Sequence, residues 1–358
     1  MKILLVSLSN NYDHQLSLYS LFDEMLKSGL DVYTLGINEP KYRISFTSRN
    51  LFLDAPKKPG LSFGAFKTKE LKRCCQFILK EGFDIVYFES LHIWNVYLFK
   101  KIKKHLSIVH SIHDVIPHES KLSFFIKIFN KIIYKNADYV VVRSRNALEY
   151  CNSKKRIPKN NIVYLPLGRK WRDYRPCQST DKVLFFGRIT RYKGLENLLT
   201  ICKELPNTQF LIIGKVIEKK DSDLLNLMKQ LSNVTVCDKY VSEEEMIDYF
   251  NCSDCVILPY KSATQSGVIV DSYSFSRPCI AFNVGGIKEQ IADGQTGFLV
   301  SGGLDEFKNR IVQYINSSDV QKEEMCKNAY SFGKDNYSVQ QLSIKMMQLF
   351  KRICEDRK

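Results

Sequence analysis

Short apolar runs alternate along the whole chain with longer stretches in which apolar residues recur every three or four positions. The short runs are typical of buried strands, and the longer spacing is typical of amphipathic helices. The strand-like runs cover residues 2–7, 31–36, 84–90, 106–114, 138–144 and 161–167, then 182–187, 209–214, 234–238, 254–260, 277–282 and 297–300. The helical patterns cover residues 14–27, 66–81, 93–105 and 123–134, then 194–205, 222–231, 242–250, 267–275, 304–315 and 339–353. Because strands and helices alternate, the pattern predicts βαβ units and parallel sheets.

One polar segment, residues 168–181, separates the two halves of this pattern. It is basic, contains Pro176 and precedes a fresh strand, which predicts an interdomain linker. We therefore expect an α/β protein with two doubly wound, Rossmann-like domains, residues 1–167 and 182–337. A length of 358 residues suits two domains. In such folds a ligand lies at the carboxyl ends of the strands, here in a cleft that the two domains face.

The composition excludes several classes of protein. With 44% hydrophobic and 25% charged residues, the chain is neither disordered nor collagen-like. No apolar run reaches about 18 residues, so no transmembrane helix is predicted. The N-terminus, MKILLVSLSNNYDH, has the pattern of a first strand rather than of a signal peptide. The 11 cysteines show no framework spacing, and we expect reduced thiols in a cytoplasmic protein.

The net charge of +15 lies entirely in the first half. Residues 1–178 contain 30 Lys and Arg against 15 Asp and Glu, whereas the remaining residues contain 23 of each. Such asymmetry indicates an anionic partner for the first half, which could be nucleic acid, an acidic membrane or a phosphorylated substrate. The alternative is a basic surface that only confers solubility.

The segment 185–199, FFGRITRYKGLENLL, predicts a strand, a short loop and a helix that opens at Gly194. In this loop Gly187 is followed by Arg188 and Lys193, which stand five residues apart. A helix N-terminus presents free N–H groups and a partial positive charge, to which the two side chains add full charges. A bidentate arginine and a point-charge lysine suit the oxygens of a diphosphate. The alternative is two solvated charges at a helix start.

A second loop, residues 262–267, also follows a predicted strand and consists of small and polar residues. Gly267 allows a close approach to the backbone, so the amides of Gln265, Ser266 and Gly267 can cradle a phosphate. Asp271 lies about one turn into the next helix, where its carboxylate can accept hydrogen bonds from ribose hydroxyls. It can equally serve only to stabilise the helix N-terminus.

A third loop, within residues 283–300, holds Gly285, Gly286 and Glu289 and alone indicates no more than a glycine-rich turn. Three such loops at one sheet edge favour a nucleoside diphosphate ligand. Nothing matches the Walker A pattern, and no GxGxxG follows a strand, so ATP-type P-loop binding, NAD and FAD are disfavoured.

Three segments of the second half resemble the donor-binding domain of retaining glycosyltransferases of family 4, which have the GT-B fold. These segments are GRITRYKGLENLL, SGVIVDSYSFSRPCIAFNVGG and KEQIADGQTGFLV. The resemblance covers the whole chain in layout and is specific over residues 182–300. It implies that Arg188 and Lys193 bind the donor diphosphate and stabilise the leaving group. It implies that Asp271 binds the ribose, and that the helix within residues 338–358 crosses back to the first domain.

The chain departs from the family pattern at two glutamates. Asp271 stands for the second of them, and Ala263 stands at the place of the first. We therefore expect Thr264 or Gln265 to contact the transferred sugar, and we expect the nucleobase to lie near Tyr240.

In the first half, His113 ends a predicted strand, where the resemblance implies a histidine near the transferred sugar. His118, five residues later, is expected to face an acceptor phosphate. A metal site is disfavoured, because this spacing spans a proline and no carboxylate or cysteine cluster completes it. The family's Gly-Gly loop after the first strand is absent, and Asn10 and Asn11 stand there as candidates for sugar or acceptor contacts, together with Glu289.

Two stretches of the first half combine lysine with aromatic and aliphatic residues, residues 121–135 and the run KKIKK at 100–104 that follows Trp94. Helices of this kind can lie on an anionic membrane. They can equally pack on a sheet with their lysines outward.

We expect a retaining, metal-independent glycosyltransferase that moves a sugar from a UDP- or GDP-sugar to a glycan acceptor and needs no cofactor. The acceptor is expected to be lipid-linked, at the inner face of the membrane, in bacterial surface polysaccharide biosynthesis. An epimerase or glucan synthase of the same fold stays open, and so does an inactive paralogue, suggested by Ala263. A nucleic-acid-binding protein is a further alternative, although no RNP, zinc-finger or helix-turn-helix signature supports it and we expect no nucleic-acid partner.

Overall fold

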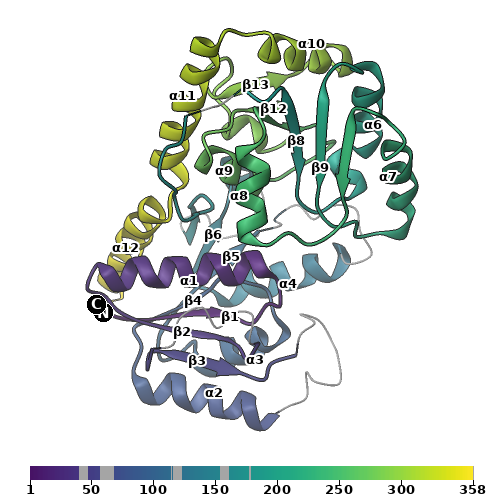
Figure 1. The fold of residues 1–358 in the computed structure, drawn as a ribbon. Coiled ribbons are helices and arrows are strands. Elements are labelled where there is room, and N and C mark those ends of the chain that lie inside the picture. The colour runs from purple at the N-terminus through teal and green to yellow at the C-terminus, as the bar shows by residue number, and fades with distance from the viewer. Residues whose placement is uncertain are drawn as a thin grey trace. The chain divides into compact units, whose positions relative to one another are not determined.

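The computed structural model describes residues 1–39, 47–56, 68–113, 115, 123–153, 161–176 and 179–357. The chain divides into two compact units (Figure 1). The first unit comprises Met1–Lys170 together with Val339–Lys358, and the second comprises Trp171–Ser338.

The first unit is built on a parallel sheet with the strand order β3-β2-β1-β4-β5-β6-β7. Its strands are β1 (Lys2–Ser7), β2 (Asp31–Ile37), β3 (Asn50–Leu53), β4 (Ile85–Phe88), β5 (Ser107–Ile112), β6 (Tyr139–Val142) and β7 (Ile162–Tyr164). Ile3 of β1 pairs with Val32 of β2 on one side and with Ile85 of β4 on the other. The chain therefore reverses its direction of growth between β1 and β4, as in doubly wound folds.

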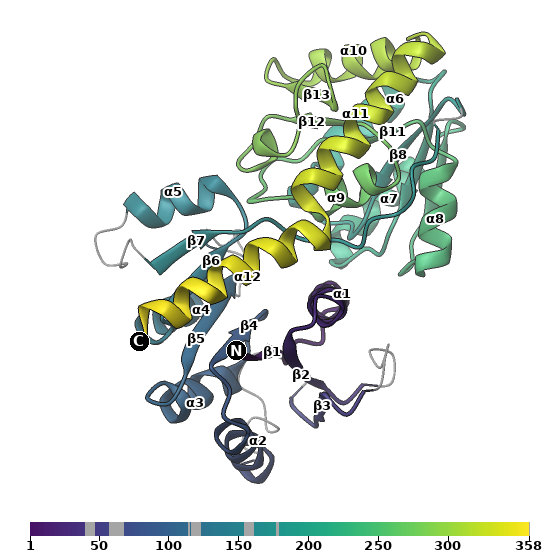
Figure 2. The same cartoon turned by 90° about the vertical axis from the view of Figure 1, so that its left-hand side faces the viewer.

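Helices cover both faces of this sheet: α1 (Tyr12–Lys27), α2 (Thr68–Glu81), α3 (Ile93–Ile102), α4 (Ser123–Asn136), α5 (Arg145–Ser153) and α12 (Val339–Asp356). Successive strand residues point to opposite faces. Ile3 and Leu5 pack with α1 and α12, whereas Leu4 and Val6 belong to the core that includes α2 and α3. The C-terminal helix α12 thus belongs to the core of the first unit, and it lies against α1 in that layer (Figure 2).

The second unit is built on a parallel sheet with the order β10-β9-β8-β11-β12-β13. Its strands are β8 (Lys182–Phe186), β9 (Gln209–Ile213), β10 (Val234–Cys237), β11 (Cys255–Leu258), β12 (Cys279–Phe282) and β13 (Gly297–Val300). Its helices are α6 (Leu195–Glu204), α7 (Ser222–Met228), α8 (Glu243–Asn251), α9 (Gly267–Ser274), α10 (Leu304–Ile315) and α11 (Asp319–Tyr337), with the short 3-10 turns η4 (Arg191–Lys193), η5 (Lys219–Asp221) and η6 (Ile287–Glu289).

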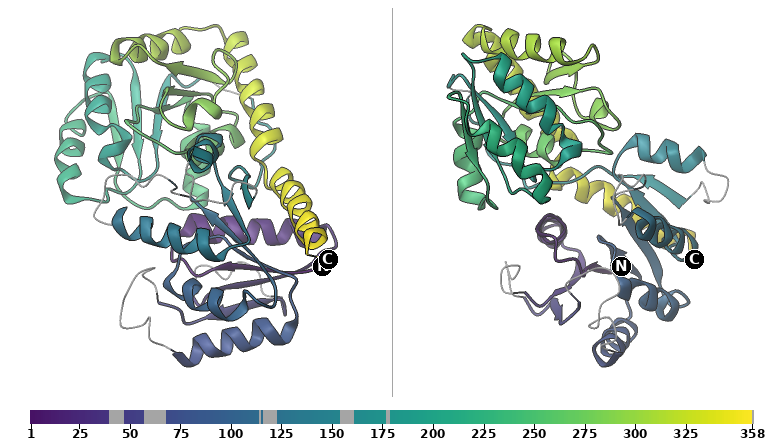
Figure 3. Two further views of the ribbon diagram at one scale, coloured as in Figure 1. Left: turned by 180° about the vertical axis from the view of Figure 1, so that it is seen from behind. Right: turned by 90° about the vertical axis from the view of Figure 1, so that its right-hand side faces the viewer.

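Helix α6 contacts α7 and α10, whereas α9 contacts α11 (Figure 3). Right-handed crossovers place helices on one face when the sheet grows in one direction and on the other face when it grows in the opposite direction. The two groups of helices therefore lie on opposite faces of the sheet. The growth reverses between β8 and β11, so the connections that follow these two strands run in opposite directions along the sheet. The predicted α/β class with two Rossmann-like units is confirmed.

Much of the segment predicted as a linker, residues 168–181, packs on the second unit. The Trp171 ring lies 5.9 Å from the Tyr330 ring, and the Tyr330 hydroxyl donates to the Arg172 carbonyl at 2.8 Å. Thr180 donates its backbone N–H and its hydroxyl to the buried carboxylate of Asp254, at 2.6 and 2.7 Å. Several polar groups of this segment therefore have specific partners within the second unit.

Candidate functional site

The loops after β8, β11 and β12 meet at the carboxyl edge of the second unit. Gly187 follows β8 and has φ at +100°, and a Cβ at this position would lie 2.9 Å from Nζ of Lys193 and 3.4 Å from Val268 of α9. Only glycine leaves the space between the strand end, the lysine and the start of α9. The lysine and the first turn of α9 are therefore brought together around Gly187.

Lys193 is buried within this edge, with a side chain that reaches back over the β8 end. Its Nζ donates to the Phe186 carbonyl at 3.4 Å and lies 5.1 Å from the centre of the Tyr260 ring. Gly194, with φ at +76°, packs against the Pro259 carbonyl so closely that a Cβ would overlap it. This contact ties the start of α6 to the end of β11 and fixes where Lys193 enters the site.

Arg188 lies in the same loop but is exposed. Its backbone neighbour Ile189 forms a parallel bridge with Val216, which holds the loop on the extension of β9. Arg188 is close enough to Tyr260 for its charge to act on that hydroxyl. The structure thus places one buried and one exposed cation near Tyr260, an arrangement that suits a diphosphate.

The loop after β11 is held by the loop after β12. The Ala263 carbonyl accepts from the Gly286 N–H at 3.0 Å, and Gly285, with φ at +53°, lies against the same carbonyl. Gln290 braces the other side, because its side chain accepts from the Ser266 N–H at 2.6 Å and donates to the Ser266 carbonyl at 3.0 Å. The backbone before α9 is therefore held on both sides.

Helix α9 begins at Gly267, and the preceding residue Ser266 provides no side-chain cap. Its first N–H groups can therefore meet an anion. Thr264 and Gln265 are partly buried in the loop that leads to them, and Asp271 is partly buried one turn into the helix. The residues predicted to form a phosphate cradle thus lie together in one continuous segment, and their role stays a prediction.

The two other predicted contacts of the second unit, Tyr240 and Glu289, lie in the loop after β10 and in η6. Tyr240 follows β10 and is 74% exposed, so its ring is available at the β10 side of the edge. Glu289 lies in η6, and its backbone carbonyl accepts from the Tyr337 hydroxyl at 3.2 Å. The assignment of these residues to nucleobase and sugar stays a prediction.

In the first unit, His113 follows β5 at the carboxyl edge and contacts Glu89, which follows β4. Its Nε2 lies 2.9 Å from the Glu89 carbonyl and 3.1 Å from Glu89 Oε1. Nη2 of Arg143, which follows β6, donates to Glu89 Oε2 and to the Tyr87 hydroxyl, each at 2.7 Å. The Tyr87 hydroxyl also donates to Oε2. We call Tyr87, Glu89, Arg143 and His113 the edge cluster.

Burial dominates the electrostatics of the edge cluster. By itself burial would raise the pKa of Glu89, but the charge of Arg143 and the hydrogen bonds from His113 and Tyr87 hold it well below its usual range. His14, from the start of α1, stacks on His113 with ring centres 4.6 Å apart, and burial lowers the pKa of His14 to about 3. At neutral pH the edge cluster therefore contains an ionised glutamate, and the histidine that stacks on it, His14, is neutral.

The sequence did not single out Glu89, Arg143 or Tyr87. The available signal was a charged residue directly after an apolar run, Glu89 after β4 and Arg143 after β6. These two strands lie on either side of β5, the strand that His113 follows. Of the other predicted residues, Asn11 caps α1 by accepting from the Asp13 N–H at 3.0 Å, and Asn10 precedes it. His118 lies outside the described residues.

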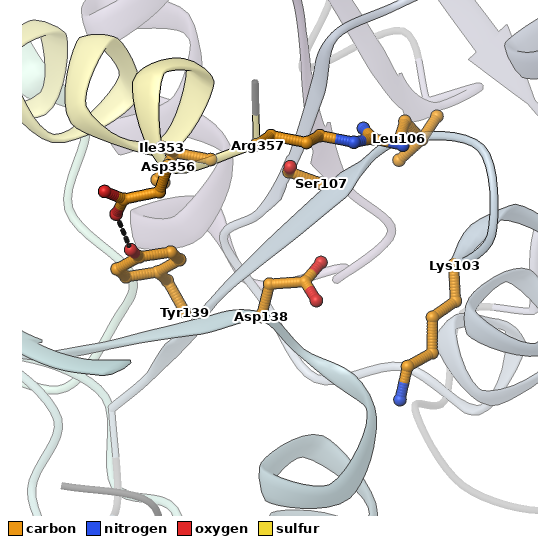
Figure 4. Close-up of a pocket in the computed structure, with 8 residues that line it drawn as sticks. All are labelled: Lys103, Leu106, Ser107, Asp138, Tyr139, Ile353, Asp356 and Arg357. Atoms are coloured by element: carbon orange, nitrogen blue, oxygen red, sulfur yellow. Dashed lines mark hydrogen bonds between the residues drawn. The ribbon is translucent and has the colours of Figure 1, made fainter. Parts of the chain in front are cut away.

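A polar cavity of about 210 Å³ lies at the opposite edge of the first sheet (Figure 4). Its lining includes Ser107 and Tyr139, the first residues of β5 and β6, and the α12 residue Asp356. The Tyr139 hydroxyl donates to Asp356 at 2.6 Å across it. Ligands of doubly wound folds lie at the carboxyl edge, whereas this cavity lies where the strands begin.

Helix α4 exposes apolar side chains beside its lysines. Phe124, Phe125 and Ile128 are 66%, 53% and 39% exposed, and Lys127 and Lys131 are exposed as well. Within the described ranges, no helix combines the length and apolar character that a bilayer span requires. In those same ranges no three His, Cys, Asp or Glu side chains gather into a group that could hold a metal ion.

Comparisons with known proteins cover both halves of the chain. Residues 16–169 match the family model described as Glycosyltransferase Family 4, and residues 180–317 match the model described as Glycosyl transferases group 1. The chain is 25% identical over 359 residues to an uncharacterised glycosyltransferase of Methanocaldococcus jannaschii, with 90% of each chain covered. It is 25% identical over 299 residues to an uncharacterised 41.2 kDa protein in the cps region of Klebsiella pneumoniae, with 75% of this chain and 79% of that protein covered. Among solved structures, HepE from Anabaena in complex with UDP and glucose has a TM-score of 0.75 at 16% identity, with 98% of this chain and 99% of that chain covered.

Proposed function

The chain is a glycosyltransferase of the GT-B fold, similar to glycosyltransferase family 4, and on this premise we propose that it transfers a sugar from a nucleotide diphosphate sugar, with retention and without a metal ion. The observation that carries this proposal is the cradle of the second unit. There a buried lysine, an exposed arginine and the uncapped start of α9 meet around Gly187. The binding of UDP and glucose by HepE, a protein of the same fold, supports this class of donor.

In this reaction the cradle stabilises the charge that develops on the diphosphate as it leaves. Lys193 and Arg188 supply the positive charge that a divalent cation supplies elsewhere, and the α9 amides add directed N–H groups. The bond from the anomeric carbon to the phosphate oxygen breaks while the bond to the acceptor oxygen forms on the same face. The departing phosphate oxygen takes the proton of the acceptor hydroxyl. This retaining route is carried over from the family resemblance.

We further propose that the first unit takes a lipid-linked glycan at the inner face of a membrane, for a surface polysaccharide. The first 178 residues carry the whole net charge, and α4 places Phe124 and Phe125 beside exposed lysines. Such a face suits an anionic bilayer, because apolar side chains enter the interface while lysines meet headgroups. The relative in the cps region of Klebsiella pneumoniae supports the polysaccharide role.

A thermal-shift panel with UDP, GDP, ADP and CMP, each with EDTA, tests the donor proposal. A ligand that binds the folded state raises its melting temperature in proportion to its affinity, so one nucleoside diphosphate should stabilise the chain with the chelator present. Hydrolysis of the matching nucleotide sugar should then be measurable. Stabilisation only without the chelator would contradict metal independence. No stabilisation by any nucleotide would instead favour an inactive paralogue or a nucleic-acid-binding protein.

Vesicle co-sedimentation tests the membrane proposal. The chain should sediment with anionic vesicles and much less with neutral ones, and F124S/F125S should reduce this binding without lowering nucleotide affinity. Equal sedimentation of the variant would refute the assignment of α4 to the membrane.

A further inference from the structure

The side chain of Glu89 is held by two neighbours that leave it no freedom to turn. Glu89 is 1% exposed, and its Oε2 accepts from both Arg143 and Tyr87. Arg143 is itself anchored, because its Nη1 donates to the Leu165 and Pro166 carbonyls at 3.4 and 3.2 Å. The remaining carboxylate oxygen, Oε1, has a set position, and it faces His113.

The contacts of His113 determine which ring nitrogen carries the proton. Its Nε2 lies 2.9 Å from the Glu89 backbone carbonyl, and a carbonyl oxygen can only accept. Nε2 must therefore be the protonated nitrogen, and the negatively charged Glu89 Oε1, 3.1 Å from the same nitrogen, favours the same protonation. In the neutral ring Nδ1 is then a lone-pair acceptor, and among the described residues it has no hydrogen-bond partner.

The other titratable groups around His113 do not compete for this arrangement. His14 stacks on the ring from α1, and burial keeps it neutral, with a pKa of about 3. His110 of β5 is also buried, with a pKa of about 4. Charge reaches the site from Glu89, from Arg143, and from Asp13, which acts on His14. The stacked His14 ring holds the plane of His113, and Glu89 holds its rotation within that plane.

We propose that Glu89, clamped by Arg143 and Tyr87, is a positioning residue that keeps the His113 proton on Nε2 and so presents the Nδ1 lone pair to a hydroxyl of the sugar ligand. The part of this inference that concerns the ligand rests on the proposed function. The part that concerns the proton does not, because it follows from the contacts of the folded chain. The ligand recognised would be one that donates a hydroxyl hydrogen to the carboxyl edge of the first unit.

Nitrogen-15 spectra of the histidine side chains test the proton position directly. The chain has 6 histidines, and the His113 signals can be assigned by their loss in H113N. At pH 8 the folded protein should show His113 with hydrogen on Nε2 alone. E89Q keeps the backbone carbonyl but removes the carboxylate charge, and its amide can donate to the ring, so a fraction of the Nδ1–H tautomer should appear beside the Nε2–H form. The matched control is E149Q, the same change at an exposed position of α5.

Donor hydrolysis measures the consequence. E89Q should lower kcat about tenfold, the value of one well-placed hydrogen bond, while the donor KM changes less than about threefold. In the H113N background, E89Q should have little further effect, because both changes act through the same ring. If E89Q unfolds the chain by leaving Arg143 unpaired, the double variant E89L/R143M removes both charges and keeps the measurement possible.

The outcomes separate the two proposals. Hydrogen on Nδ1 in the wild type would overturn the inference, and so would an equal loss of kcat for E89Q with and without His113. An Nε2 proton that becomes mixed in E89Q, in a protein that hydrolyses no nucleotide sugar, would uphold the clamp and refute the proposed function. Hydrolysis by the wild type with an unchanged kcat in E89Q would refute the positioning role and leave the proposed function standing.

Discussion

Replacement of Lys193 by methionine removes a buried positive charge and keeps the length of the side chain. The ammonium lies 3.4 Å from the Phe186 carbonyl and 5.1 Å from the Tyr260 ring centre, and it faces the space that Gly187 leaves open. A methionine can occupy the same path over the end of β8. The change therefore tests the charge with little change in packing.

The two expected effects differ greatly in size. Loss of one preorganised group that stabilises developing negative charge costs about 3–4 kcal/mol, or about 10²–10³-fold in kcat. The free energy of unfolding should change by less than about 1 kcal/mol, because replacing a buried charge by an apolar group of similar volume is often neutral. The variant should thus be folded and nearly inactive.

Three measurements on the same preparation decide the matter: donor hydrolysis at saturating donor, nucleoside diphosphate affinity by calorimetry, and urea unfolding. The matched control is K308M. It removes a partly buried lysine of α10 that forms ion pairs with Glu204 and Asp305. The control should retain full turnover. A K193M enzyme within about threefold of wild-type kcat would refute the role of the lysine in leaving-group stabilisation. A loss of activity that only follows unfolding would refute it as well.

Three further changes test separate parts of the structure. Burial lowers the pKa of His92 to about 4, so between pH 6.5 and pH 4 the unfolded chain takes up a proton at this residue and the folded chain does not. This difference should lower the free energy of unfolding by roughly 2 kcal/mol at pH 5. In H92N, whose side chain can still cap α3, the loss of unfolding free energy between pH 7 and pH 5 should be smaller by that amount in urea unfolding. G285A should destabilise the second unit more than G294A, because both glycines have positive φ but only a Cβ at 285 would overlap the Ala263 carbonyl; equal unfolding free energies would contradict the packing of these loops. D271N should weaken binding of the ribonucleotide about five- to tenfold but leave binding of its 2′,3′-dideoxy analogue nearly unchanged in calorimetry; an equal loss for both would exclude a contact to the ribose.

The sheets could be predicted because their strands are buried on both faces and so form continuous apolar runs. Strand β3 was not predicted, because it has only four residues and lies at the edge of its sheet. Helix α11 was not predicted either, for a different reason. Its buried positions include Cys326, Ala329 and Gly333, and Gly333 lies directly against Trp171 and Tyr273. A helix that packs through small residues shows no apolar stripe, although it packs closely.

The candidate site of the second unit was predictable because its chemistry is local. Gly187, Arg188 and Lys193 lie within one loop, and the α9 cradle lies within another. The edge cluster was not predictable in this way. Glu89, His113 and Arg143 come from three loops, and they meet only because β4, β5 and β6 are neighbours in the sheet. Their pairing also depends on rotamers, which spacing along the chain does not reveal.

The positions of the charged residues in the first half are more informative than their net charge. At the carboxyl edge the buried charges of Glu89 and Arg143 compensate each other, and the stacked His14 is neutral. Among the described residues, exposed lysines lie on α4 and at the end of α3, and they include Lys100, Lys127 and Lys131. Exposed charges act over about 8–10 Å at physiological ionic strength, whereas buried pairs are screened much less. On the proposed function, long-range attraction of an anionic partner and local recognition of a sugar thus belong to different sets of residues in this unit, and a change in one set need not disturb the other.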